Sequence, residues 1–234
     1  LEEAEVLSLP GVFPRENVVY LAVSSGLNTG LRLREALGDE LWMRYACTID
    51  AISAVSPGIT LVFFPSYEVM EGVGKYLDAE AEPRRSRDLI SLWRRVTDGK
   101  KHLLLAVSGG KLSEGVEFTA KSGEGRRSLV GTVIVAGLPF PSPDFEMALR
   151  SRRYEGRFGH GRAFTLLSIL PMVNRVLQGI GRAVRGPRDR AAVILLDDRT
   201  EYLRYLPEEV RNELQLCSQE ELPKEVAWFY RPKT

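Results

Sequence analysis

The sequence has only two cysteines, Cys47 and Cys217, and only two histidines, His102 and His160. None of them belongs to a CxxC or CxxH pattern, so we predict no metal site. An iron–sulfur cluster needs about four cysteine ligands, and this chain cannot supply them. The two histidines lie far apart in the sequence and suggest neither a catalytic dyad nor a zinc site, so we assign them no catalytic role.

Long hydrophobic runs are also absent. No run of eighteen apolar residues occurs, and the N-terminal LEEAEVLSLP lacks the basic and then apolar order of a secretory signal. We therefore expect no membrane segment and a cytoplasmic location. With 234 residues, 44% of them hydrophobic and 27% charged, the chain fits one soluble domain with a substantial core.

Lysine is scarce relative to arginine, with 7 lysines against 25 arginines, although the net charge is only +1. A GC-rich genome or a thermophilic prokaryotic source, which the 4 asparagines and 3 glutamines also suggest, could explain the excess of arginine. Neither explains why arginines gather at 84–95 and at 150–190. The planar guanidinium binds phosphate in a bidentate way, so these clusters favour a polyanionic partner.

A phosphate-binding loop of the form GxxxxGK[ST] is missing. Lys111 follows two glycines but precedes Leu112, and GVGK at 72–75 has Val69 where the first glycine should stand. The chain therefore has no Walker A loop of its own. LLDD at 195–198 resembles a magnesium-binding Walker B segment, but without that loop a turn or capping role is the better interpretation.

Five short apolar, β-branched runs alternate with helical stretches, which predicts an α/β fold with a mostly parallel central sheet flanked by helices. The expected strands are 18–23, 59–64, 102–107, 130–138 and 191–197. Helical periodicity covers 39–55, 67–77, 86–98, about 143–156 and about 171–185. We expect an exposed hairpin or loop at 119–128 and a mobile basic loop at 156–164.

Ligands of open parallel sheets bind where strands end, and two such places carry suitable residues. After the second strand, Ser66 can cap the next helix and Tyr67 can stack on a base or sugar, although capping and packing alone would also explain both residues. After the third, Gly109 and Gly110 would let a phosphate or sugar approach the main chain and Lys111 supplies charge, although an ordinary glycine turn is the favoured interpretation.

A third candidate is QGIGRAVR at 178–185. On a helix, Gln178, Arg182 and Arg185 would share one face, because their spacings are four and three. A solvated helix face is the alternative. Gly179 and Gly181 each cost a helix about 1 kcal/mol relative to alanine, which favours close approach of a phosphate chain.

Taken in order, LVFFPSYEVME, GGKLSEGVEF and QGIGRAVRG resemble motifs IV, V and VI of superfamily 2 helicases. Together with GLPFPSPD, they resemble the XPD family of iron–sulfur DNA helicases over about residues 18–199. The resemblance implies a three-layer RecA-like domain of the P-loop NTPase type, the second motor domain of a helicase. It implies that residues 1–17 lead in from a missing first motor domain and that 200–234 form a C-terminal helical extension.

The resemblance also implies roles for individual residues. Arg182 and Arg185 would be arginine fingers for ATP held with Mg²⁺ by the N-terminal half, and Gln178 would position water or phosphate. Gly115, Glu117 and Gly181 would lie at the nucleotide, with Glu117 standing where the family commonly has Asp. The following residues would hold single-stranded DNA: Ser66, Tyr67, Ser108, Gly110 and Lys111.

As a whole, such a protein would be a 5′–3′ DNA helicase acting in DNA repair, with its iron–sulfur cluster in the N-terminal half. We expect this chain alone to be inactive as an ATPase. Two other functions remain open: a RecA-like module that binds nucleic acid without hydrolysis, and half of a sugar-nucleotide transferase, which the lack of a base or acceptor-site dyad disfavours.

Overall fold

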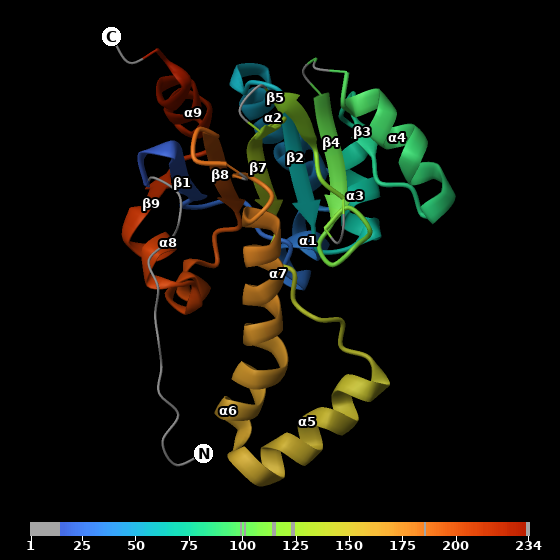
Figure 1. The fold of residues 1–234 in the computed structure, drawn as a ribbon. Coiled ribbons are helices and arrows are strands. Elements are labelled where there is room, and N and C mark those ends of the chain that lie inside the picture. Colours follow the sequence, from blue (N-terminus) through green and yellow to red (C-terminus); the bar gives the residue numbers. More distant parts are fainter. Residues whose placement is uncertain are drawn as a thin grey trace.

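The computed structural model describes residues 15–98, 100, 102–113, 116–122, 125–184 and 186–232. Seven strands in these residues form one parallel sheet in the order β3-β4-β2-β7-β8-β1-β9 (Figure 1). In chain order the strands are β1 (Val18–Val23), β2 (Ile59–Phe64), β3 (Glu80–Ala81), β4 (His102–Val107), β7 (Val130–Ala136), β8 (Ala191–Leu196) and β9 (Leu214–Cys217). The prediction of a mostly parallel central sheet is confirmed.

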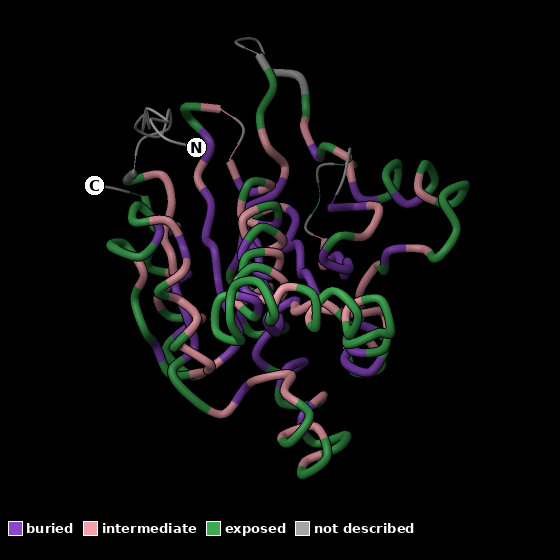
Figure 2. Tube along the Cα trace, turned by 90° about the horizontal axis from the view of Figure 1, so that it is seen from below, coloured by how far each residue is buried: buried purple, intermediate pink, exposed green. Residues whose placement is uncertain are grey.

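The five strands expected from apolar runs all form, and burial explains why they were recognisable. Every residue of β2, β7 and β8 is buried, so these central strands show no alternation of exposed and buried positions. Figure 2 shows buried segments in the middle of the molecule, with exposed turns of helix around them. The predicted runs 130–138 and 191–197 extend slightly beyond the strands, which end at Ala136 and Leu196.

Helices cover both faces of the sheet. One face packs against α2 (Asp39–Val55), α3 (Tyr67–Gly74) and α9 (Leu222–Tyr230), through one cluster of buried side chains. The opposite face packs against α4 (Leu89–Val96), α7 (Leu170–Ile180) and α8 (Glu208–Glu213). The result is a three-layer arrangement in which the carboxyl ends of the strands share one rim.

Two edge strands escaped sequence recognition because they are short. Strand β3 has two residues and pairs with β4, while β9 has four and pairs with β1. The segment from residue 200 onwards contains a 3₁₀ helix at Thr200–Tyr205 before α8, and α9 after β9. It also adds the strand β9 to the sheet.

The predicted hairpin is confirmed as β5 (Thr119–Ser122) paired antiparallel with β6 (Gly125–Ser128). Two shorter elements complete the fold before α2, a 3₁₀ helix at Arg15–Asn17 and α1 (Leu31–Leu37). Another 3₁₀ helix, Ser86–Asp88, leads directly into α4, so the stretch expected as a helix at 86–98 is helical until Val96.

The prediction of a mobile basic loop at 156–164 is wrong. Helix α5 (Phe145–Phe158) continues through Gly156, turns at Gly159 with φ of 80°, and is followed at once by α6 (His160–Phe164). A π-helical turn at Thr165–Ile169 then joins α6 to α7, and α5 and α6 extend away from the sheet beyond its carboxyl rim (Figure 1). Of the three glycines between residues 156 and 164, only Gly159 has the positive φ that a turn requires, so the glycine content of this stretch does not indicate a loop.

Residues His160–Ile180 form the one helix in the described part of the chain that is long and apolar enough to cross a membrane. Its second half buries Met172, Val173 and Val176 against the sheet. That packing is what a core helix of a globular domain requires, and it accounts for the apolar composition of this half.

Candidate nucleotide and nucleic-acid site

The segments after β2 and β4 are neighbours at the carboxyl rim because these strands pair directly, with Phe64 opposite Val107. The main-chain N–H of Ser108 donates to the carbonyl of Phe64 at 2.8 Å, so the contact continues beyond the strand ends. The predicted DNA-binding segments, 66–67 and 108–111, are therefore brought together by the fold.

A buried carboxylate that the sequence interpretation missed links these segments. Glu82, 3% exposed, accepts hydrogen bonds from the Tyr67 hydroxyl at 3.0 Å and from the main-chain N–H of Lys111 at 2.7 Å, both through Oε1. Its Oε2 accepts from the N–H of Val107 at 3.1 Å. No motif marks Glu82, and only its position just after the two-residue strand β3 brings it to the rim.

The carboxylate of Glu82 leaves no room for a side chain at position 110, where the chain has glycine. A Cβ on residue 110 would lie 2.6 Å from Glu82 Oε1 and 2.8 Å from the carbonyl oxygen of Val107. The close approach that was expected of Gly110 is thus present, but the group that approaches is Glu82. The main-chain N–H of Gly110 is engaged with the carbonyl of Val107 at 2.8 Å.

Ser66 and Tyr67 both have structural roles here. The Ser66 hydroxyl caps α3 by accepting from the N–H of Val69 at 3.3 Å, which confirms the capping prediction. The guanidinium of Arg84 lies 4.7 Å from the centre of the Tyr67 ring and covers one of its faces. Burial, followed by the hydrogen bond to Glu82, raises the pKa of Tyr67 to about 12.

Lys111 directs its ammonium group at the chain rather than outward. Its Nζ donates to the carbonyl of Pro83 at 3.1 Å and also to the carbonyl of Arg84. Ser108, next in this turn, is 8% exposed. The turn is therefore held to the segment that follows β3, which places Arg84 beside the two predicted segments.

The QGIGRAVR stripe does not lie on one helix, and that prediction is wrong. Helix α7 ends at Ile180, and Gly181 and Arg182 continue as a tight turn in which the N–H of Arg182 donates to the carbonyl of Gly179 at 3.0 Å. Gln178 is exposed on the last turn of α7. Arg185 lies outside the described residues.

The glycines of this stripe also have another explanation than phosphate approach. Gly179 is buried, and a Cβ there would lie 3.1 Å from Cδ2 of Phe63, so the residue allows α7 to pack closely on β2. Gly181 is exposed and ends the helix. Close packing against the sheet thus outweighs the helix propensity lost at Gly179.

Arg182 connects motif VI to motif V. Its Nη1 donates to the carbonyl of Val116 at 2.9 Å, and its Nη2 donates to the carbonyl of Ser113. These carbonyls flank residues 114–115, which lie outside the described residues. The contact with nucleotide that is expected of Gly115 is therefore not part of the described structure. Glu117 is exposed and accepts from Nη1 of Arg126, on strand β6, at 3.2 Å.

The aspartates after β8 act as turn residues, as expected. Asp197, 2% exposed, accepts from the main-chain N–H of Leu138 at 2.8 Å and from the guanidinium of Arg199 at 2.7 and 2.6 Å. Asp198 accepts from Gly26 and Asn28 at 2.8 Å each. Both carboxylates therefore hold the loops that follow β1, β7 and β8.

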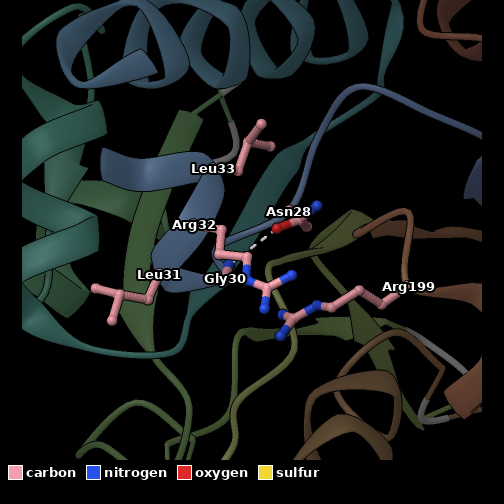
Figure 3. A pocket seen from close by; sticks show the side chains of 6 residues that line it. All are labelled: Asn28, Gly30, Leu31, Arg32, Leu33 and Arg199. Atoms are coloured by element: carbon pink, nitrogen blue, oxygen red, sulfur yellow. Dashed lines mark hydrogen bonds between the residues drawn. The ribbon is translucent and has the colours of Figure 1, made fainter. Parts of the chain in front are cut away.

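A cavity of about 610 Å³ opens beside these loops. It is lined by Asn28, Gly30, Leu31, Arg32, Leu33 and Arg199. Figure 3 shows the guanidinium groups of Arg32 and Arg199 pointing toward one another across it. Both ends of the carboxyl rim therefore carry arginines, but Arg199 is paired with Asp197 and Arg84, near β4, is paired with Glu71.

The residues that the structure describes offer no cluster of metal ligands. They contain no group of three or more His, Cys, Asp or Glu side chains that could hold a metal ion. Cys47 and Cys217 are both free thiols, the first exposed and the second buried. These residues do not fit a magnesium or iron–sulfur site, so we derive no chemical step through either group in this chain.

Comparison with known proteins identifies the family. The family model for the helicase C-terminal domain matches residues 49–214. The ATP-dependent DNA helicase XPD of Sulfolobus acidocaldarius is 32% identical over 171 residues, covering 70% of this chain and 29% of that protein. A Drosophila melanogaster protein named regulator of telomere elongation helicase 1 homolog is 30% identical over 176 residues, covering 65% of this chain and 17% of that protein.

Comparison with solved structures leads to the same family. A structure named XPD_Helicase superposes with a TM-score of 0.72 at 27% identity, covering 86% of this chain and 35% of that chain. A second, XPD_APO, gives 0.66 at 28% identity over 86% of this chain and 39% of that chain. The fold is thus RecA-like, as predicted, and the chain spans less than a third of the length of the curated relatives it matches. The chain belongs to the helicase C-terminal domain family, with XPD-type helicases among its relatives.

Proposed function

We propose that this chain is the C-terminal motor half of an ATP-dependent DNA helicase of the XPD type, moving 5′ to 3′ on single-stranded DNA in DNA repair. ATP and Mg²⁺ are bound mainly by the N-terminal motor domain of the same protein, which also holds the iron–sulfur cluster. This half supplies positive charge to the nucleotide and binds DNA.

The observation that carries the proposal is the contact of Arg182 with the segment after β4. Its guanidinium, at the end of α7, donates to the carbonyls of Ser113 and Val116. The same segment begins with Ser108 and Lys111 at the rim, where Glu82 holds it. A displacement of Arg182 towards a phosphate would therefore move the rim turn, which couples the nucleotide wall to the DNA face.

Arg182 and Arg185 act on the nucleotide as arginine fingers, and Gln178, exposed beside them, positions the attacking water or the phosphate. The guanidinium of Arg182 carries its five N–H donors in a planar fork, the geometry that suits the oxygens of a phosphate. Gly115, Glu117 and Gly181 complete this wall.

The DNA face is the carboxyl rim. The main-chain N–H groups of Ser108, Gly110 and Lys111 are engaged with protein acceptors, so phosphate contacts there come from side chains, including the hydroxyls of Ser66 and Ser108. Tyr67 stacks on a base or sugar with the ring face that Arg84 leaves uncovered. Exposed arginines of α5 and α6 add charge beyond the rim: Arg150, Arg152, Arg153, Arg157 and Arg162.

The test is Arg182→Ala in the full-length helicase. We expect ATP turnover to fall by about a hundredfold or more, on the scale of a lost arginine finger, while affinity for single-stranded DNA changes little. Arg94→Ala removes an exposed arginine from α4 and serves as the matched control. A variant that loses DNA binding and keeps hydrolysis would refute the assignment and favour the non-hydrolysing binding module.

A second measurement tests the division of labour between the two halves. The purified 234-residue chain is expected to show no ATP turnover, because it supplies only one wall of the site. Robust hydrolysis by this chain alone would contradict the half-site proposal. Unwinding of duplexes with a single 5′ or 3′ tail by the full protein tests the polarity.

A further inference from the structure

A second arginine-rich cavity, of about 590 Å³, lies at the other end of the sheet. Gly58, Val130 and Arg190 line it, and these residues stand at the amino ends of β2, β7 and β8. The remaining lining residues are Pro57, Ala120, Arg127, Ser128, Leu129, Gly131, Arg188, Asp189 and Tyr230. The cavity therefore lies opposite the rim that carries Ser66 and Lys111, and it is separate from the proposed DNA face.

The charge of the lining is positive. Three arginines, Arg127, Arg188 and Arg190, and one acid, Asp189, are among the lining residues. Asp189 is 5% exposed and uses both oxygens on the main chain, accepting from Gly186 at 2.8 Å and from Ser128 at 3.1 Å. The lining thus has an excess of two positive charges, and its one acid is occupied in holding loops.

The three arginines come from different elements, and their side chains differ in how firmly they are held. Arg190 is held in place, because its guanidinium lies 4.6 Å from the centre of the Phe229 ring and donates to the carbonyl of Phe229. Arg127, on strand β6, and Arg188, in the loop before β8, are exposed. A ligand that enters can therefore be approached by guanidinium groups from more than one side.

The rest of the lining provides little competing hydrogen bonding. The Tyr230 hydroxyl is already used, since it accepts from the N–H of Ala192 at 2.9 Å and donates to the carbonyl of Gly131. Pro57 and Leu129 contribute apolar surface. An apolar lining with a few convergent charged groups, in a volume of several hundred cubic ångströms, is typical of small-molecule sites.

We propose that this cavity binds a small phosphorylated molecule. A phosphate monoester carries about −1.5 to −2 charge at neutral pH, which matches the excess of two positive charges, whereas a carboxylate carries only one negative charge. Guanidinium groups bind phosphate oxygens in pairs of parallel hydrogen bonds. The apolar residues beside them leave room for the organic part of such a ligand.

Pyrophosphate is the probe for the test, titrated calorimetrically into the full-length protein with its ATP site filled by a non-hydrolysable ATP analogue. We expect binding to the unaltered protein and a weakening of about a hundredfold in Arg127→Ala/Arg188→Ala, about tenfold for each guanidinium removed. Arg190 is left unchanged because it packs on Phe229. The control, Arg94→Ala/Arg211→Ala, removes the same charge from exposed positions on α4 and α8 and should bind like the unaltered protein.

Three results would overturn the proposal. The first is the absence of pyrophosphate binding in the unaltered protein, and the second is equal weakening in both double variants, which would indicate only a diffuse field. The third concerns the source of the phosphate. If the affinity for a single-stranded oligonucleotide depends on Arg127 and Arg188, and the affinity for pyrophosphate does not, the cavity belongs to nucleic acid. Circular dichroism of both double variants confirms that each is folded.

Discussion

Replacing Glu82 should destabilise the domain far more than replacing any exposed carboxylate. The side chain is 3% exposed and accepts three hydrogen bonds, from the Tyr67 hydroxyl and from the N–H groups of Val107 and Lys111. No sequence motif marks the residue. Its predicted importance therefore rests entirely on the geometry of the rim.

The size of the effect follows from the donors that lose their acceptor. Glu82→Ala leaves three donors unpaired, and at about 1 kcal/mol each, the low end for groups partly reached by water, the cost is about 3 kcal/mol. Glu82→Gln keeps one oxygen, which can stay with Tyr67 and Lys111, and places an amide NH₂ against the N–H of Val107, for a cost of about 1 to 3 kcal/mol. For a domain of this size, each kcal/mol lowers the melting temperature by about 2–4 °C.

Thermal unfolding followed by circular dichroism measures these losses. Glu71→Gln is the control, because Glu71 pairs with Arg84 at the surface with 52% of its side chain exposed, and such pairs contribute less than about 1 kcal/mol. Tyr67→Phe removes one donor only, and its combination with Glu82→Gln should cost less than the sum of the two single changes. If Glu82→Gln and Glu71→Gln shift the melting temperature equally, the role assigned to Glu82 is refuted.

Two further predictions concern the same rim. Gly110→Ala should lower the melting temperature, because its Cβ would lie 2.6 Å from Glu82 Oε1, and an unchanged value would mean that the turn relaxes freely. The pKa values of Tyr67 and Tyr230 are both raised to about 12, with burial the largest cause. The folded state therefore favours the neutral phenols, and the stability they contribute is present below pH 10 and declines from there to about pH 12. Tyrosinate absorbance during alkaline titration should lose one late-titrating group in Tyr67→Phe, and an unaltered titration curve would contradict the assignment.

The sequence predicted the central strands and the long helices well because their signals are local. Runs such as ITLVFF are apolar on both faces, and α2 covers the predicted 39–55. Strands β3 and β9 were not predicted, because segments of two and four residues are too short to show a periodic pattern of apolar residues. The loop predicted at 156–164 is wrong for a different reason: glycine favours a break in a helix, but α5 continues through Gly156.

The candidate site was predicted in part. The motif segments do lie at strand ends, and neighbouring strands bring Ser66 close to Ser108. The single helical face for Gln178 and Arg182 was wrong, because α7 ends at Ile180 and Arg182 turns towards the carbonyls of Ser113 and Val116. Spacing in the sequence fixes a helical face only as long as the helix continues.

Composition and periodicity by themselves determined that this protein is an α/β domain with buried parallel strands, because burial on both faces demands apolar runs that can be recognised one strand at a time. The motif residues likewise determined its resemblance to helicase motor domains. Only the tertiary structure decided what those residues touch. Gly110 faces Glu82, Gly179 faces Phe63 and Arg182 holds the segment after β4, because such contacts join positions far apart in the chain, and no local pattern records them.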